Sequence, residues 1–381
     1  MLSYSGDDRG DAFNSSEPLV SVVMPAFNAS PYIVRSLQSA ARQTYQSLEI
    51  IVVNDGSTDD TAKLVEQMAV ADSRIRLLTT PNRGVAAARN TGIQASSGQF
   101  VAFLDADDLW HQTKIEKQVN ALNRLSPQWA AVYSLHYVID LDGEIIYPGR
   151  ANVARGYIYA RHLTFKYVGN GSTLLVRRDV ALEIGGFDSS YAAAGIEGCE
   201  DLDFELRLAA HYYMEVIPER LVGYRQYPGN MSSNHIQMAR GALEVVRRSL
   251  AANPQLPRYA ARSATTATVK YAFQELKRAE SRFQSLMAAW AIFLNDPQFI
   301  LRLAFQEGLR GIQQCLPLRT KVTRSADPPR LNRSKFDEQS VPARVECPEE
   351  NARSQRHLMR LTAIDVRLSS ILESAGRLGE M

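Results

Sequence analysis

The sequence predicts an α/β fold in which a mostly parallel sheet is flanked by helices. Short apolar runs alternate with segments of helical periodicity over residues 19–110, which is the pattern of successive strand–helix units. Polar clusters follow the apolar runs, at the edge where an open parallel sheet binds its ligands. The 381-residue chain is 45% hydrophobic and 22% charged, a composition that excludes disorder of the chain as a whole.

The first part of the chain alternates four predicted strands with three predicted helices. The strands are LVSVVMP, LEIIVVND, RIRLLTT and QFVAFLD. The helices are SPYIVRSLQSAARQTY, TAKLVEQMAVA, which follows the turn and capping residues DGSTDDT, and the Ala-rich GVAAARNTGIQAS. Because the carboxyl ends of parallel strands share one edge, we expect Pro25 to Asn28, Asn54 to Ser57 and Asp105 to Asp108 to converge in one crevice.

The pattern changes after residue 110. A hairpin is predicted from AAVYSLHYVID and DGEIIYPG, with its turn at Asp142-Gly143. A strand, a helix and a turn follow in STLLVRRDVALEIGGFD, then a helix beginning near Glu200 and a strand in MEVIPERLVGYRQY.

The remaining segments are assigned by composition. We expect residues 1–18 to be a disordered N-terminus, 236–323 a helical extension and 324–351 a polar, Pro-bearing linker. Residues 352–381 are predicted to form an amphipathic helix with one apolar face, made of Leu358, Leu361, Ile364, Leu368 and Leu372.

Charge and cysteine content bear on the compartment. Residues 1–240 hold 21 basic and 27 acidic residues, a net charge of −6, and residues 241–381 hold 22 and 14, a net charge of +8. The basic tail favours an anionic surface such as lipid headgroups about as much as it favours plain solvation. Three scattered cysteines give no disulfide framework, and no apolar run approaches a membrane span. We therefore expect a cytoplasmic protein that could rest on the inner face of a membrane.

A peripheral membrane contact has one further source in the sequence. The tail mixes aromatic and basic residues at helical spacing, namely Trp290, Phe293, Phe299, Leu303 and Phe305 with Arg302 and Arg310. This pattern fits helices lying on a membrane, but packing onto the rest of the protein explains it as well and is favoured.

Three carboxylates in FLDADD, residues 103–108, follow the fourth predicted strand. Like charges this close repel one another, so a positive partner is expected. An Asp-x-Asp pair can hold Mg²⁺ or Mn²⁺, a cation whose shell is usually completed by substrate phosphates. No phosphate-binding P-loop and no dinucleotide fingerprint follow the first strand. The stretch therefore predicts a metal-bound diphosphate.

Four stretches in order carry a family resemblance: VSVVMPAFNAS, EIIVVNDGSTDDT, NRGVAAARNTG and VAFLDADD. Together they resemble the donor-binding half of the family 2 glycosyltransferases, which have the GT-A fold, and the resemblance extends over residues 19 to about 228. It implies a GT-A domain over residues 19–235, with a nucleotide-sugar half at 19–110 and an acceptor half at 111–235. A UDP-sugar is the favoured donor, and no nucleic-acid partner is expected.

The resemblance also implies roles for single residues. Asp55 would accept a hydrogen bond from the nucleotide base, and Phe27 would stack under that base. Asp105 would contact the ribose or sugar and share the metal with Asp107, the main ligand. The other implied donor-site residues are Pro25, Ala26, Asn28, Asn82, Gly84, Arg89 near the base or phosphate, and Ala106. Asp55 could instead be a turn or cap residue, Phe27 a core residue, and Arg89 the partner of a helix-face carboxylate.

The base for transfer is expected in EDLDFELRL, which is similar to the family's base-bearing segment. Asp201 is the expected base, with Glu200 as the alternative, because a helix start favours an ionised carboxylate and a base must take the acceptor's proton. Asp203 and Glu205 are expected to be solvated helix charges, and Asp108 a surface or capping residue.

One position departs from the family pattern. In YRQYPGNMS, Tyr227 stands where many relatives carry a His that assists the metal or phosphate. A neutral Tyr is a poor metal ligand, so metal binding is expected to be weaker or completed differently. His235 could substitute, although a lone His is more often structural or solvated.

The resulting hypothesis is an inverting, metal-dependent glycosyltransferase that uses Mn²⁺ or Mg²⁺. Its acceptor would be a glycan or a lipid-linked glycan, as in surface polysaccharide synthesis, and its oligomeric state is open. A non-catalytic nucleotide-sugar binding or scaffold protein of the same fold is the alternative. A nucleotidyltransferase is less favoured, because PAFNASPY is not the Gly-rich basic loop that it would need.

Overall fold

The structure is a computed structural model that describes residues 17–280, 335–336 and 352–374. Within these ranges the strands form one nine-stranded sheet in the order β3-β2-β1-β4-β8-β6-β9-β5, with β7 paired to β6. The first four strands are parallel and have the predicted positions: β1 (Val20–Ala26), β2 (Leu48–Asp55), β3 (Ile75–Thr80) and β4 (Phe100–Phe103). The crossover helices between them are α1 (Ile33–Ala41), α2 (Thr61–Ala71) and α3 (Val85–Ala95).

The second half of the sheet is mixed, whereas a mostly parallel sheet was expected. Strand β8 (Leu174–Arg177) is antiparallel to β4 and to β6 (Trp129–Ile139), and β6 is parallel to β9 (Tyr213–Arg225). The predicted hairpin is formed by β6 and β7 (Ile145–Pro148), and the two-residue β5 (Leu109–Trp110) pairs with β9. The helix α4 (Lys114–Leu122) was not predicted.

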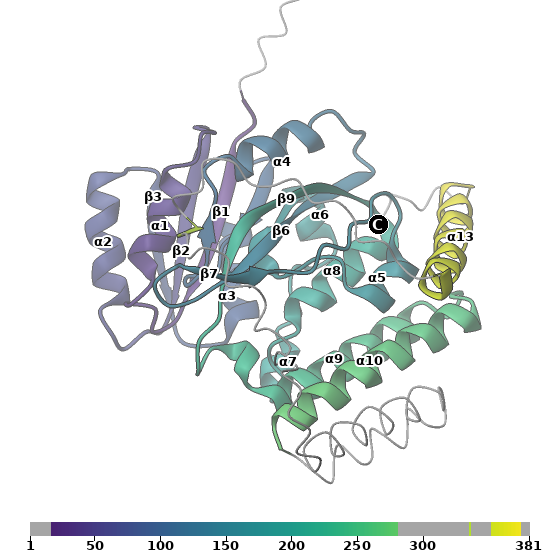
Figure 1. Ribbon diagram of the computed structural model, residues 1–381. Coiled ribbons are helices and arrows are strands. Elements are labelled where there is room, and N and C mark those ends of the chain that lie inside the picture. The colour runs from purple at the N-terminus through teal and green to yellow at the C-terminus, as the bar shows by residue number, and fades with distance from the viewer. Residues whose placement is uncertain (1–16, 281–334, 337–351, 375–381) are drawn as a thin grey trace, which may run out of the picture.

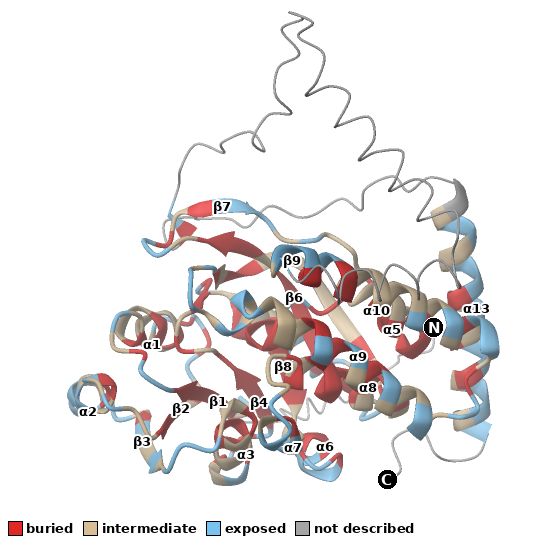
Figure 2. Cartoon of the chain, turned by 90° about the horizontal axis from the view of Figure 1, so that it is seen from below, coloured by how far each residue is buried: buried red, intermediate tan, exposed pale blue. Residues whose placement is uncertain are grey.

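Helices cover both faces of the sheet, as Figures 1 and 2 show. Apolar residues of α1, α2 and α4 form one core with the strands, and those of α3 join a second core with the later helices. The later helices are α5 (Tyr159–Phe165), α6 (Arg178–Glu183), α7 (Ser190–Ala193), α8 (Glu200–His211), α9 (His235–Ala252) and α10 (Arg258–Arg278). The fold class predicted from the sequence is thus confirmed, with α9 packing on α8 and α10 on α5.

The C-terminal helix α13 (Ala352–Ser374) packs against α5 (Figure 1). Leu361 and Leu368 are buried in the second core, and the apolar face includes the residues that the sequence placed there. Asp365 is 1% exposed and accepts hydrogen bonds from Ala160 N (2.6 Å) and Arg161 Nε (2.7 Å). The buried carboxylate of Asp365 on α13 therefore binds the first turn of α5 and holds α13 against the rest of the protein.

Two residues of the expected linker are part of the fold. Lys335 pairs with Glu144 as an antiparallel bridge, and Phe336 is 1% exposed. Most of residues 324–351 lies outside the described ranges, as do the aromatic and basic residues between Trp290 and Arg310 and most of the N-terminal segment. In the part of the chain that the structure describes, no helix is long and apolar enough to cross a membrane.

Candidate active site

The loops that follow β1 and β2 are joined to each other at the predicted edge of the sheet. Asn28 N donates to Ser57 Oγ (3.0 Å), and Thr58 N donates to Asn28 Oδ1 (2.9 Å). Asn28 has a φ of 47°, a left-handed conformation that Asn tolerates better than most residues. Phe27 is 52% exposed, which excludes its assignment to the core and leaves its ring available to a ligand. Pro25 and Ala26 are buried beneath this loop.

Asp55 holds the segment that leads into α3. Its carboxylate accepts hydrogen bonds from Arg83 N (3.0 Å) and Gly84 N (2.9 Å), at the start of that helix. This is the turn and capping role that was considered as the alternative. A carboxylate has about four acceptor positions, so a hydrogen bond from a base remains compatible with these contacts. The exposed Asn82 lies against Gly56, where a Cβ atom would come within 2.8 Å of Asn82 N.

The carboxylates of the acidic loop, residues 105–108, have three different partners. Asp105 Oδ1 lies 2.6 Å from Arg89 Nη2, and Asp107 Oδ2 accepts a hydrogen bond from the Tyr227 hydroxyl (3.1 Å). Ala106 is buried between them, and its carbonyl accepts from Ser36 Oγ (2.7 Å). Burial, followed by the charge of Asp105, raises the pKa of Asp107 to about 6.

Asp108 is fully buried, so its expected place on the surface is wrong. Its Oδ2 accepts from Asn170 Nδ2 (2.7 Å) and Ser172 Oγ (2.6 Å), and its Oδ1 accepts from Arg225 N (2.9 Å). Burial and the charge of Asp107 raise its pKa, and the hydrogen bonds from Ser172 and Arg225 oppose that rise. Asp108 therefore fastens the acidic loop to β9 and to the turn before β8.

Arg89 is the buried cation between the two halves of the site. It is 5% exposed, its guanidinium carbon lies 5.0 Å from the centre of the Phe187 ring, and its Nη2 is bound to Asp105. Burial alone would lower the pKa of Arg89, but the charges of Asp105 and Asp201 outweigh burial and raise it. The guanidinium is paired through Nη2 with a strand-end carboxylate, not with the helix-face carboxylate considered as the alternative, and its expected role near a base or phosphate stays a prediction.

The two candidate bases stand at the start of α8 in different surroundings. Glu200 is 3% exposed, and both of its oxygens lie 3.0 Å from Gly198 N, so it closes the turn before the helix. Asp201 is partly exposed and accepts a hydrogen bond from Leu202 N (2.7 Å). Burial raises the pKa of Asp201, and the nearby charge of Arg89 opposes the rise.

Two carboxylates farther along α8 are buried, although they were expected to be solvated. Asp203 accepts from the Tyr191 hydroxyl (3.1 Å) and from Arg207 Nε (2.8 Å). Glu205 lies 3.1 Å from His162 Nε2. Because His162 Nδ1 accepts from Tyr167 N (3.0 Å) and burial lowers the His162 pKa to about 3, the neutral ring donates to Glu205 through Nε2. Arg207 is on α8 itself, whereas Tyr191 of α7 and His162 of α5 come from other segments and join α8 to the core.

The acidic loop has the chemistry of a divalent cation site completed by a substrate. Among the described residues, no group of three or more His, Cys, Asp or Glu side chains could hold a metal by itself. Asp105 and Asp107 provide oxygen ligands of the kind that Mg²⁺ and Mn²⁺ prefer. Two buried donors beside them, Arg89 Nε and Arg225 Nη2, have no hydrogen-bond partner. Unpaired cationic donors next to carboxylates fit a metal bound together with phosphate oxygens.

Tyr227 occupies the place that the sequence marked as unusual. Its ring centre lies 5.0 Å from that of Tyr32, and the guanidinium carbon of Arg225 lies 5.4 Å from the Tyr32 ring. Its hydroxyl reaches Asp107, so the residue contacts the expected metal ligand directly. His235 Nδ1 is paired with Glu275 Oε2 (2.7 Å) on α10, so its described side-chain partner lies away from the acidic loop.

Sequence reasoning missed several residues of this site. Asn170, Ser172 and Arg225, which bind Asp108, were not among the residues expected in the site. Lys166 ends α5 in a left-handed conformation (φ 49°), with its ammonium 4.2 Å from the centre of the Tyr271 ring on α10. Its charge lowers the pKa of Asp201. No spacing in the sequence connects these residues with the acidic loop.

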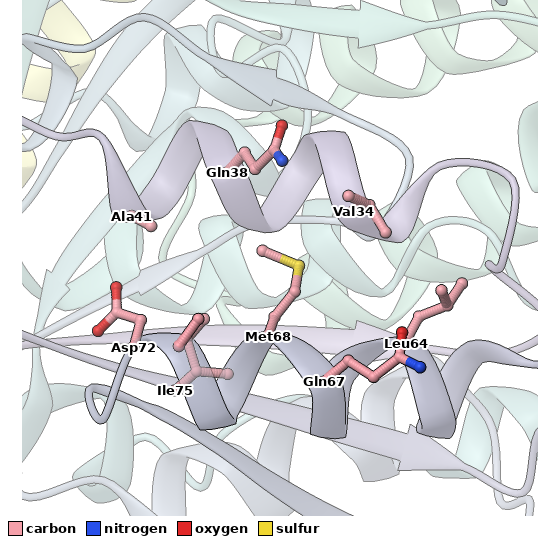
Figure 3. A pocket seen from close by; sticks show the side chains of 9 residues that line it. Val34, Gln38, Ala41, Leu64, Gln67, Met68, Asp72 and Ile75 are labelled. Atoms are coloured by element: carbon pink, nitrogen blue, oxygen red, sulfur yellow. The ribbon is translucent and has the colours of Figure 1, made fainter.

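An open groove lies elsewhere on the protein, between α1 and α2 (Figure 3). Its lining includes Val34, Leu64, Met68 and Asp72, and it contains none of the site residues above. The groove therefore has no part in the chemistry of the acidic loop.

Comparison with known proteins agrees with this geometry. Residues 21–177 match the model of glycosyl transferase family 2. An uncharacterized glycosyltransferase of Haemophilus influenzae is 37% identical over 130 residues, which cover 34% of this chain and 51% of that protein. The glucosyltransferase WfgD of Escherichia coli is 44% identical over 105 residues, 27% of this chain and 41% of WfgD. The chain thus spans about half of such relatives or less.

A solved structure agrees in fold. Residues 1–349 of S. aureus TarS, in complex with UDP-GlcNAc, superpose with a TM-score of 0.51 at 18% identity, covering 74% of this chain and 82% of that one. With the acidic loop at the carboxyl ends of parallel strands, residues 21–177 are similar to the family 2 glycosyltransferases, and the described part of the chain has the GT-A fold.

Proposed function

We propose that the protein transfers a sugar from a nucleotide-sugar donor, preferentially a UDP-sugar, to a glycan or lipid-linked acceptor with inversion at the anomeric carbon. The observation that carries the proposal is the acidic loop, in which Asp105 and Asp107 lie beside two buried guanidinium donors without partners. A site of this kind suits a diphosphate bound with a divalent cation.

The donor would lie across the loops that follow β1, β2 and β4. The exposed ring of Phe27 is available for stacking on a base, and Asp55 retains acceptor capacity for a base N–H. Asp107 and Asp105 would hold Mn²⁺ or Mg²⁺, which stabilises the charge of the leaving diphosphate when it is bound. Arg225 Nη2 can donate to a phosphate oxygen without losing any contact that it makes at present.

Asp201 is the better placed of the two candidate bases. It is partly exposed, whereas Glu200 is buried with both oxygens directed at Gly198 N. A base must reach the proton that it removes. Asp201 would take the proton of the acceptor hydroxyl as that oxygen attacks the anomeric carbon from the face opposite the leaving diphosphate. Its raised pKa makes it a stronger base than an ordinary Asp.

The nature of the acceptor is supported by a relative. WfgD carries the name of a UDP-Glc:alpha-D-GlcNAc-diphosphoundecaprenol beta-1,3-glucosyltransferase, so its donor is a UDP-sugar and its acceptor is lipid-linked. The family match over residues 21–177 includes the whole acidic loop, which supports the donor part of the analogy. The proposal therefore extends to surface polysaccharide synthesis with an acceptor on a lipid carrier.

The melting temperature of the protein with UDP, GDP or CDP, each with and without Mn²⁺, tests the proposal. A ligand at a hundred times its Kd adds about 2.7 kcal/mol of stability, a shift of several degrees. We expect a rise with UDP that requires Mn²⁺ and is lost in Asp107→Ala. A rise in melting temperature with GDP or CDP instead would indicate that the donor is a GDP-sugar or a CDP-sugar.

A second experiment separates an enzyme from a non-catalytic binding protein. Asp201→Asn should keep the UDP and Mn²⁺ shift and abolish sugar transfer to a defined acceptor. Full transfer by Asp201→Asn would show that the base is another residue. Donor binding without any transfer by the unmodified chain, across a panel of acceptors, would favour the scaffold protein.

A further inference from the structure

Lys335 and Phe336 lie on the β6–β7 hairpin, almost two hundred residues away in the sequence. Phe336 N donates to Gly143 O (3.0 Å) in the hairpin turn, and Lys335 forms an antiparallel bridge with Glu144. The Phe336 side chain is 1% exposed. A single aromatic residue from a polar segment has therefore inserted into the fold at a defined place.

The ring fills a small apolar pocket under the hairpin. Leu109, Tyr137, Ile139 and Ile145 form one buried cluster with Phe336, and the centres of the Tyr137 and Phe336 rings lie 6.4 Å apart. The opposite wall is Gly223 of β9. A Cβ atom at position 223 would lie 3.0 Å from the Phe336 ring and 3.0 Å from Ile139, so a larger residue there would crowd the ring.

Two connections lead from this pocket to the acidic loop. Leu109, which touches the ring, directly follows Asp108 and pairs with Gly223. The hairpin turn, to which Phe336 N is bound, offers the carbonyls of Asp140 and Leu141 to Arg225 Nη1, each at 2.6 Å.

Arg225 completes the second connection. Its Nε donates to the carbonyl of Asp107 (2.6 Å), and its backbone N donates to Asp108. The turn therefore fixes the guanidinium that holds the backbone of the acidic loop. The turn is braced from the other side by Arg35 Nη1, which donates to Asp142 O (2.8 Å).

We propose that Lys335–Phe336 is an intramolecular anchor that positions the donor site. Docking of Phe336 holds the hairpin turn, and through Arg225 it holds the acidic loop in the arrangement that binds a nucleoside diphosphate with a divalent cation. Phe336 contacts neither ligand, so it is a positioning residue. The inference rests on the proposed function, because it takes the acidic loop as the donor site.

A residue that only covers an apolar patch would behave differently from an anchor. Loss of a covering residue lowers the stability of the protein and leaves the affinity for the donor unchanged. Loss of an anchor also weakens donor binding. The two roles are therefore separated by measuring the Kd of UDP with Mn²⁺ alongside the melting temperature.

The docked position is tested by a designed disulfide in the full chain. Bridge partners in antiparallel strands have Cα atoms about 4.5–5.5 Å apart, within the range of disulfides. With Cys315 and Cys347 replaced by Ser, Glu144→Cys combined with Lys335→Cys should cross-link under mild oxidation. Val70→Cys combined with Lys335→Cys is the control, since Val70 is 91% exposed on α2. Cross-linking no greater than in the control would overturn the docking.

The positioning role is tested by Phe336→Ala, by the milder Phe336→Leu and by Leu361→Ala. Leu361 is fully buried on α13, which packs on the acceptor half, so its loss should lower the melting temperature without touching the donor site. We expect Phe336→Ala to raise the Kd of UDP with Mn²⁺ by about two- to thirtyfold, the range of coupling through residues that touch no ligand. Phe336→Leu should show a smaller rise and Leu361→Ala less than twofold.

Each outcome decides between the inference and the proposed function. If the unmodified chain binds UDP with Mn²⁺ and Phe336→Ala binds it equally well, the positioning role is overturned and the proposed function stands. If the unmodified chain binds none of the nucleotides with Mn²⁺, the proposed function fails and the positioning role fails with it. A Kd that rises as much in Leu361→Ala as in Phe336→Ala would also overturn the inference.

Discussion

Replacing Arg89 by Met removes one of the two buried guanidinium groups of the site while keeping most of the side-chain volume. The guanidinium is paired with Asp105 Oδ1 at 2.6 Å, and its charge also acts on Asp201 and Glu200. The variant would leave these carboxylates without their common counter-charge. We expect a large loss of stability, because a buried charge without a partner is far costlier than a missing pair.

The loss in the free energy of unfolding can be estimated from the Arg89–Asp105 distance and from the exposure of Asp105. Two unit charges at 2.6 Å attract by roughly 6 kcal/mol at an effective dielectric constant of about 20. Desolvation of both groups takes back much of this energy, and breaking a buried pair costs about 3–5 kcal/mol in measured cases. The Asp105 side chain is 26% exposed, so water can partly solvate it, and the lower end applies. A loss of about 3 kcal/mol corresponds to a melting temperature lower by roughly 6–12 °C.

Denaturant unfolding with thermal melting measures this change. Arg76→Met is the control, because the Arg76 side chain is 51% exposed and lies 3.6 Å from Glu49, a surface pair worth less than about 1 kcal/mol. Arg89→Met combined with Asp105→Asn removes both charges and should be more stable than Arg89→Met alone by about 1 kcal/mol or more. If Arg89→Met is as stable as Arg76→Met, Arg89 is not the counter-charge of the buried carboxylates.

Two further predictions concern the acceptor half. Lys166→Met removes a positive charge that lowers the pKa of Asp201, so the pKa of Asp201 should rise further above that of an ordinary Asp. The acid limb of the kcat/KM profile should therefore move to higher pH, and the plateau of the profile should stay unchanged. The base acts in its ionised form, so activity below the limb should fall. Asp365→Ala leaves Ala160 N and Arg161 N without their acceptor and should cost about 2 kcal/mol, or roughly 4–8 °C in melting temperature, with donor affinity unchanged.

Matched variants control for general effects of these changes. Lys117→Met removes a partly exposed lysine that pairs with Glu219, and it should leave the pH profile in place. Asp179→Ala removes an exposed carboxylate that accepts a hydrogen bond from the adjacent Val180 N, and it should change the stability by less than about 0.5 kcal/mol. An acid limb that stays in place in Lys166→Met would contradict Asp201 as the base, and an unchanged melting temperature in Asp365→Ala would contradict the docking of α13.

The parallel strands were predictable because their signal is local. β1, β2 and β4 are buried on both faces, so each is an almost continuous apolar run. The helix α4 was missed because two of its buried positions are polar. Lys114 donates to Gln118 (2.7 Å) and lies 4.0 Å from the centre of the Trp110 ring, an arrangement that the sequence pattern of a solvated lysine does not reveal.

The acidic loop was predictable as a motif, but the partners of its carboxylates were not. Asp108 was expected to be a surface or capping residue and Glu205 a solvated helix charge, because the sequence shows no partner for either carboxylate. Their partners come from distant segments: Arg225 from β9 for Asp108 and His162 from α5 for Glu205. A contact between residues far apart in sequence leaves no periodicity, so these errors could be corrected only by the folded structure.

The partners of the acidic loop bear on the charges of the proposed ligand. Asp105 is paired with Arg89, whereas the carboxylate of Asp107 accepts from a neutral hydroxyl, that of Tyr227, and the nearby charge of Arg225 does not prevent burial and Asp105 from raising its pKa to about 6. The loop therefore favours an added cation at Asp107. The unpaired Nε of Arg89 and Nη2 of Arg225 favour an anion in the same place. A cation alone would face these guanidinium groups, and an anion alone would face the carboxylates. The proposed ligand, a nucleoside diphosphate with a divalent cation, brings both charges, and we therefore expect UDP and Mn²⁺ to stabilise the protein together and neither of them alone.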